Sequence, residues 1–196
     1  MSDEPKKRVL WLTNLPAPYR FPIWDRMSES VDLTVVFLLK QKNWRNWPAP
    51  ENKNWKHKFL SFNSIKMKEF DFIPSFRNAK KLLNQVDVAI IGGWEAPMFI
   101  RTILLAKSKG IPIIQFYESF QESHRFKYGP IAWFRELIFS KPDKFITISK
   151  KSELSLVNMG VAKDRIVTLF NPVDVGWFHK FAQGHRAIQS HGHQYI

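Results

Sequence analysis

The chain has 196 residues, of which 44% are hydrophobic, and it carries a formal net charge of +13. That length and hydrophobic content are enough for a sizeable core, which excludes wholesale disorder. The sequence has no cysteine, which excludes disulfides and thiolate metal sites and fits a reducing environment. It also shows neither an apolar leader nor an apolar run long enough to span a membrane. We therefore expect a cytoplasmic protein, or one that is peripheral on the inner face of the cell membrane.

Seven short apolar runs predict β-strands. Several of them are continuous rather than alternating, which is typical of strands covered on both faces of a parallel sheet. In chain order they are residues 8–13, 32–39, 57–62, 86–93, 111–117, 143–149 and 165–170.

Helical segments lie between most of these runs, at residues 22–28, 74–84, 96–109, 130–140 and 150–159. Prolines stand at the start of several of them, Ser149 is suited to cap the last, and Gly110 and Gly160 are placed to end two of them. The alternation of strand and helix predicts an α/β protein with a Rossmann-like, doubly wound and mostly parallel sheet.

Positive charge is concentrated between Lys40 and Lys81, where eleven Lys and Arg residues face three acidic ones, a balance of +8. Eight aromatic residues are interleaved with these charges. Three interpretations stay open: a solvated basic face, a surface for nucleic-acid phosphates, or a surface for anionic lipid headgroups.

Polar residues follow the predicted strands, where a parallel sheet binds its ligands. The first loop, "NLPAPYR", has no glycine to approach a phosphate, although its two prolines would fix the backbone at low entropic cost. Its Arg20 either offers a planar fork of donors to a phosphate or pairs with a local acid such as Asp25. The site residues expected in this loop are Asn14, Pro16, Pro18, Tyr19 and Arg20.

Three later strand exits add candidates. Gly92 and Gly93 either allow close backbone approach to a ligand or adopt a positive φ. Glu118 either binds a ligand hydroxyl or caps the segment that follows it, since an unpaired carboxylate beside a buried strand is costly. The sequence contains no nucleophile triad, P-loop or strict G-x-G-x-x-G motif, so a binding site is visible without an obvious catalytic set. The expected residues are Gly92, Gly93, Trp94, Glu118, Ser119 and Asn171.

With these loops placed, the sequence resembles the N-terminal domain of a glycosyltransferase family 4 enzyme of the GT-B fold. The resemblance depends on "VLWLTNLPAPYRFPIWDRM", "DVAIIGGW", "LLAKSKGIPIIQFYES" and above all "DKFITISKKSELSLVNMGVAKDRIVTLFNPVDVGWFHK". It covers about residues 8–180, and segment 40–81 fits it least. It implies an acceptor-binding domain over residues 1–180, with 181–196 leading into a nucleotide-sugar-binding domain that is missing here.

The resemblance implies a retaining glycosyltransferase of the hexosyltransferase type when full length, inactive as this fragment alone. It would transfer a sugar from a nucleotide sugar to a glycan or lipid-linked acceptor in polysaccharide or glycolipid synthesis, with no cofactor and no metal. The first loop would border the donor diphosphate and the acceptor, and Gly92, Gly93 and Trp94 would line the acceptor side. Many members have a histidine at the exit of the strand equivalent to "IIQFY", where this chain reads Tyr117-Glu118-Ser119. Because of this departure the resemblance assigns no catalytic residue, and Glu118 is the candidate, as a hydroxyl-binding group. Segment 40–81 would dock on an anionic membrane. A basic α/β module that binds nucleic acid is the less favoured alternative.

Overall fold

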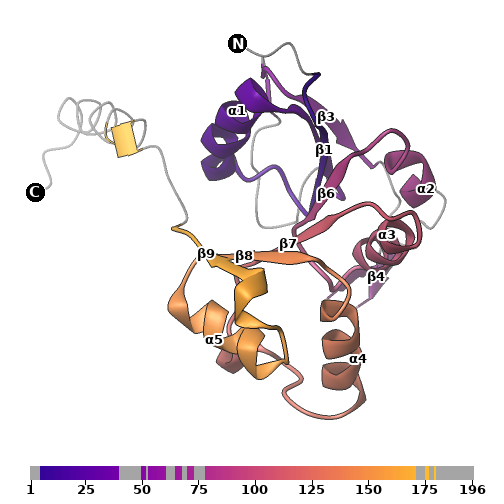
Figure 1. The fold of residues 1–196 in the computed structure, drawn as a ribbon, viewed down its shortest axis with the longest axis vertical. Coiled ribbons are helices and arrows are strands. Elements are labelled where there is room, and N and C mark those ends of the chain that lie inside the picture. The colour runs from indigo at the N-terminus through magenta and orange to yellow at the C-terminus, as the bar shows by residue number, and fades with distance from the viewer. Residues whose placement is uncertain are drawn as a thin grey trace, which may run out of the picture.

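A computed structural model describes residues 5–39, 50–51, 53–60, 65–67, 70–72, 78–170, 175–176 and 179 (Figure 1). Its centre is a seven-stranded sheet in which every pair of neighbouring strands is parallel. In spatial order the strands are β3 (Lys56–Phe59), β2 (Asp32–Phe37), β1 (Arg8–Thr13), β6 (Val88–Ile91), β7 (Ile113–Tyr117), β8 (Lys144–Thr147) and β9 (Ile166–Thr168). A strand is therefore confirmed within each of the seven predicted ranges, although residues 61 and 62 of the third range lie outside the described residues.

The chain begins near the middle of the sheet, at β1, and winds outward in both directions. Strand β1 pairs with β2 on one side and with β6 on the other. The side chain of Arg8 binds the carboxylate of Asp87 at 2.7 Å, which joins the start of β1 to the residue before β6. Hydrogen bonds from Arg8 hold the pKa of Asp87 at about 2.

In the described part of the chain, five α-helices pack on the sheet. They are α1 (Phe21–Ser30), α2 (Asn78–Leu82), α3 (Pro97–Ser108), α4 (Pro130–Phe139) and α5 (Lys150–Asn158). Figure 1 shows α1 and α3 on opposite sides of the sheet. The predicted helix over 74–84 is confirmed only in part, because residues 73–77 lie outside the described residues.

Alternate residues of the strands enter two separate cores, because successive side chains of a strand point to opposite faces. On one face, Val9 and Trp11 of β1 pack with Trp24 of α1. On the other, Leu10 and Leu12 pack with the buried sides of α3, α4 and α5. Both faces of β1 are therefore covered, as its continuous apolar sequence predicts.

A short antiparallel hairpin, β4 (Ile65–Met67) and β5 (Phe70–Phe72), is absent from the sequence prediction. The hairpin lies within the basic segment 40–81. Each of its strands has three residues, which is too short to show the alternation of apolar and polar residues that predicts a strand. Residues 40–49, 52, 61–64, 68–69 and 73–77 of that segment are outside the described part of the chain.

The predicted cap and stop signals of the helices are confirmed. The hydroxyl of Ser149 accepts a hydrogen bond from the backbone N–H of Ser152 at 3.1 Å, at the start of α5. Gly110 and Gly160, which follow α3 and α5, have φ values of +68° and +83°, the left-handed conformation that favours glycine.

Replacing Ser149 with alanine is expected to lower the free energy of unfolding by about 1 kcal/mol, because it leaves the first turn of α5 without its side-chain acceptor. Urea denaturation followed by circular dichroism measures the change. Ser149→Asp should keep nearly all of the stability, since aspartate is an equally good cap. The control is Ser140→Ala at the exposed end of α4, and equal losses at the two serines would contradict the capping role.

Candidate functional site

The predicted site lies at the carboxyl edge of β1, β6 and β7, which are neighbours in the sheet. Their register brings the following loops to the same edge. The backbone N–H of Gly92 donates to the carbonyl of Leu12 at 2.8 Å, and the side-chain amide of Gln115 donates to the carbonyl of Gly93 at 3.1 Å. Three loops that are far apart in sequence therefore meet here.

The loop after β1 is held stiffly against the sheet. Pro16 is buried, and Pro18 opens a 3-10 helix, η1 (Pro18–Arg20), that runs directly into α1. Tyr19 is half-buried, whereas Asn14 is exposed at the strand exit. The two prolines thus position a turn that directs Arg20 inward rather than toward solvent.

Arg20 and Glu118 form an ion pair that joins the loops after β1 and β7. The Arg20 side chain is only 6% exposed, and its guanidinium carbon lies 4.9 Å from the centre of the Phe116 ring. Its Nη1 also donates to the Thr13 hydroxyl, at 3.4 Å. Glu118, by contrast, keeps 33% of its side chain exposed. Of the two groups, the carboxylate is the one that an incoming ligand meets first.

The alternative pairing of Arg20 with Asp25 is wrong. The carboxylate of Asp25 instead accepts hydrogen bonds from the Trp55 indole at 2.8 Å and from the Lys53 ammonium at 3.1 Å. Capping of residues 119–123 by Glu118 is also not observed. The η2 turn (Gln121–Ser123) is capped instead by Ser123, whose hydroxyl accepts a hydrogen bond from the backbone N–H of Phe120 and donates one to its carbonyl.

The glycine pair after β6 is required for packing. Neither glycine has a positive φ, so that interpretation is wrong. A Cβ on Gly93 would lie 2.4 Å from the Phe99 ring, and one on Gly92 would lie 3.2 Å from the Thr13 hydroxyl. The close approach that the pair allows is therefore to the protein itself.

Trp94 lies at the same edge but packs toward the opposite face of the sheet from Arg20. Its ring contacts the buried Phe139 edge-on and lies 5.6 Å from the guanidinium carbon of Arg135. Ser119 is exposed beside Glu118, and Asn171 lies outside the described residues. The structure thus brings Arg20 and Glu118 together and places Trp94 apart from them.

A buried polar cluster beneath the loop after β7 has no counterpart in the sequence prediction. The Tyr117 hydroxyl lies 2.7 Å from His124 Nε2 and 3.1 Å from the Ser155 hydroxyl. Burial raises the pKa of Tyr117 and lowers that of His124, and the nearby positive charge of Arg135 lowers the latter further. Both pKa shifts favour the neutral forms of the two side chains, in which the Tyr117 hydroxyl donates a hydrogen bond to Nε2 of His124. The aromatic end of β7 and the histidine seven residues later were visible in the sequence, but their contact depends on how the loop folds back.

His124 should make the protein less stable in mild acid. Its pKa is lower in the folded state than the ordinary value near 6.5, so below about pH 6.5 the unfolded chain binds the proton first. Stability is therefore lost as the pH falls from 7 to 5. Denaturation at both pH values should show a smaller loss for His124→Gln, which keeps a hydrogen-bonding amide but does not titrate. Equal losses in the two proteins would show that other groups cause the dependence.

None of the described helices has both the length and the apolar composition needed to cross a membrane. In the described part of the chain, His, Cys, Asp and Glu residues form no cluster of three or more that is arranged to hold a metal ion. The C-terminal region contains four histidines, a residue type that often binds metal ions. The structure describes only His179, and the other three lie outside the described residues.

Comparison with known proteins identifies the class. The sequence model of glycosyltransferase family 4 matches residues 31–177. Sequence comparison with curated proteins found no match. Among solved structures, the chain is similar to Anabaena Alr3699/HepE in complex with UDP and glucose, with 10% identity and a TM-score of 0.61 over 87% of this chain and 46% of that one. It also matches a UDP-N-acetylglucosamine 2-epimerase from Rickettsia bellii, with 12% identity and a TM-score of 0.50 over 82% of this chain and 44% of that one.

At these identities the structural matches establish the fold alone, and the chain spans less than half the length of either protein. The parallel sheet, its doubly wound order and its polar carboxyl edge define a Rossmann-like α/β domain, equivalent to the N-terminal half of a GT-B fold. The family match extends over most of the chain. The protein belongs to glycosyltransferase family 4.

Proposed function

We propose that this chain is the acceptor-binding half of a retaining glycosyltransferase, of the hexosyltransferase type. The full-length enzyme would transfer a sugar from a nucleotide-sugar donor to a glycan or a lipid-linked acceptor, in polysaccharide or glycolipid synthesis. The observation that carries the proposal is the Arg20–Glu118 pair at the carboxyl edge of a family 4 domain. The solved structures with bound UDP support a nucleotide sugar as the donor class.

In this proposal Glu118 binds an acceptor hydroxyl and Arg20 is its positioning residue. The buried guanidinium is held by Thr13 and by the Phe116 ring, so it fixes the carboxylate in one place. A fixed, half-exposed carboxylate is a good acceptor for a sugar hydroxyl. Asn14 and Ser119, which are exposed on either side, supply further polar groups.

The proposed division of labour explains why the edge lacks a phosphate-binding glycine loop. The donor diphosphate would be held mainly by a second domain facing this edge, and the charge that develops on the leaving group would be neutralised by positive side chains and a helix N-terminus. This scheme needs no metal and no cofactor. The protein would work in the cytoplasm, at the inner face of the membrane where the acceptor is anchored.

The test is an NMR titration of the 196-residue chain with neutral oligosaccharides and, separately, with UDP-sugars. We expect saccharide-dependent shifts at the backbone signals of Asn14, Gly92, Glu118 and Ser119. Glu118→Gln should weaken them, and Glu122→Gln, on the same loop, should leave them unchanged. The chain alone should not turn over a nucleotide sugar.

Two results would contradict the proposal. Sugar transfer by the isolated chain would show that this half carries the donor site and the catalytic groups. Shifts confined to another part of the molecule would place the acceptor elsewhere. Tight binding of oligonucleotides with a steep dependence on salt would instead favour the nucleic-acid alternative.

A further inference from the structure

Helix α4 turns an apolar face toward the solvent. Ile131, Trp133, Phe134 and Leu137 are all exposed, with Trp133 at 65%. Of the two charged residues of the helix, Arg135 is on the inner side and only 4% exposed, whereas Glu136 is exposed. An ordinary surface helix turns its large apolar residues inward, so four of them on the solvent side of one helix are unusual.

The loop that enters α4 extends this face. Phe126 and Tyr128 are exposed, Tyr128 at 85%. The loop is tied to the helix, because Arg135 Nη1 donates to the carbonyl of Phe126 at 3.0 Å and the N–H of Trp133 donates to the carbonyl of Gly129 at 3.0 Å. The backbone of Gly129, at φ +85°, makes the turn between loop and helix. We define the α4 apolar surface as Phe126, Tyr128, Ile131, Trp133, Phe134 and Leu137.

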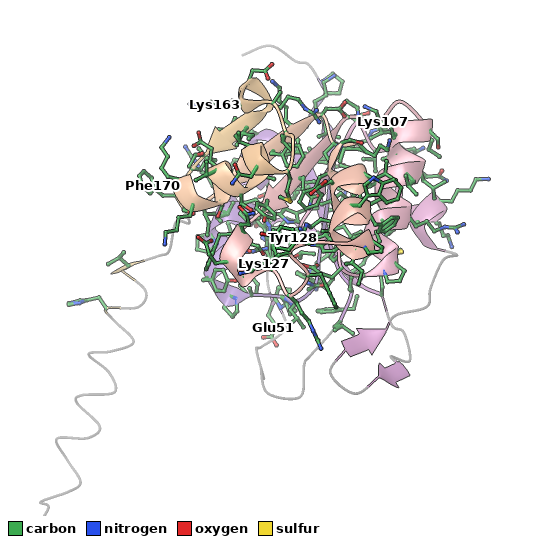
Figure 2. The ribbon with its side chains drawn as sticks, turned by 90° about the horizontal axis from the view of Figure 1, so that it is seen from below. Glu51, Lys107, Lys127, Tyr128, Lys163 and Phe170 are labelled. Carbon is green, nitrogen blue, oxygen red and sulfur yellow. The ribbon has the colours of Figure 1, made fainter. Side chains whose placement is uncertain are left out.

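An exposed group of this kind on a soluble domain marks an interaction site. Its residues also indicate the partner. Trp and Tyr have an apolar ring with one polar group, and both are enriched where proteins meet the interface of a membrane. Leu and Ile side chains need an apolar partner, which the polyanionic backbone of a nucleic acid does not offer. Arg125 and Lys127 lie on the same loop, and Lys127 is adjacent to Tyr128 in Figure 2.

The charge of the whole chain favours the same partner. With a net charge of +13, two copies repel each other, which opposes self-association through this surface. An anionic bilayer instead attracts the chain and offers both a negative interface and an apolar interior.

We propose that the α4 apolar surface is a docking surface for an anionic membrane, in which Trp133, Phe134 and Leu137 enter the interface. The loop of residues 118–129 that carries Tyr128 begins at Glu118, so docking here would bring a membrane-anchored acceptor toward the proposed site. The purpose of docking thus depends on the proposed function, but binding to vesicles does not. It is measured without donor or acceptor and can fail separately.

The first experiment is sedimentation of the full chain with vesicles of phosphatidylglycerol and phosphatidylcholine in equal parts, at physiological salt. The paired substitutions Tyr128→Ser and Trp133→Ser should raise the lipid concentration for half-maximal binding by about tenfold or more, because two large aromatic side chains lose their burial. Phe170→Ser is the matched control, since Phe170 is 92% exposed and lies well away from Tyr128 in Figure 2. It should bind like the native protein. Circular dichroism checks that all variants are folded.

The second experiment identifies which tryptophan enters the bilayer. Brominated lipids quench only those tryptophans that reach the acyl region. Trp133→Phe should keep vesicle binding, because phenylalanine is also apolar, and should lose most of the quenching. Quenching that persists would assign the contact to other tryptophans, such as Trp44 and Trp47 of the basic segment, which lie outside the described residues.

The proposal is overturned by persistent quenching in Trp133→Phe, by equal losses in the control and the paired variant, or by the absence of binding to anionic vesicles. Binding to pure phosphatidylcholine as strong as to the mixed vesicles would also overturn it. A concentration-dependent dimer abolished by Trp133→Ser, in a protein that does not bind vesicles, would make the surface a contact between copies instead.

Discussion

Replacing Glu118 with alanine is expected to lower the free energy of unfolding by about 2–3 kcal/mol, a large effect for a half-exposed residue on a loop. The reason is that the substitution leaves the charge of the buried Arg20 without its carboxylate partner. The value falls below that of a fully buried pair, because Thr13 and the Phe116 ring still contact the guanidinium. Guanidinium denaturation followed by circular dichroism measures it.

Three further variants make this prediction specific. Glu122→Ala, at an exposed glutamate of the same loop, should change stability by less than about 0.5 kcal/mol. Glu118→Gln should lose about half as much as alanine, since its amide oxygen still accepts a hydrogen bond from Arg20. Adding Arg20→Met to Glu118→Ala should restore part of the loss, because the unpaired charge is removed with its partner. If Glu118→Ala proves as stable as Glu122→Ala, the pair does not contribute in solution.

Replacing Gly93 with alanine is expected to destabilise the protein by about 2–3 kcal/mol, through overpacking. The new methyl group would lie 2.4 Å from the ring of Phe99, which is fully buried among the side chains of the core. Thermal and chemical unfolding both report the loss. The position of Gly93 beside the proposed acceptor site means that a loss of sugar binding alone would not be diagnostic.

A second-site substitution separates crowding from other causes. Phe99→Leu removes the part of the ring that meets the new methyl, so the variant with both Gly93→Ala and Phe99→Leu should be more stable than the sum of the single losses. Strict additivity of the two changes would contradict the crowding explanation. Gly92→Ala is the milder comparison, because its nearest contact, with the Thr13 hydroxyl at 3.2 Å, requires a smaller shift.

The sequence predicts the fold because its signals are local. Continuous apolar runs mark the strands, and Ser149, Gly110 and Gly160 mark helix ends, each within a few residues. The β4–β5 hairpin has strands of three residues, which is too short for any periodic signal.

The sequence predicts which residues belong to the site but not which of them contact one another, because those contacts are not local. The strand exits identify Arg20 and Glu118 separately, but the two residues are 98 positions apart in the sequence. Asp25 is close to Arg20 in the sequence, which makes it the more obvious partner for the arginine. Only the strand order shows that the loops after β1 and β7 meet, and only the fold shows that Asp25 already binds Trp55. The α4 apolar surface is similar: the composition of α4 predicts a helix but not which side of it faces the solvent.

The central position of β1 has a consequence for how the chain folds during its synthesis. Strand β1 leaves the ribosome first, yet one of its two neighbours, β6, ends only at Ile91. At ordinary elongation rates, one edge of β1 therefore stays without its partner for roughly 4–16 s. During that time an apolar strand with free backbone N–H and C=O groups is open to chaperones and to other nascent chains. The Arg8–Asp87 pair, which joins the start of β1 to the residue before β6, can form only at the end of this interval.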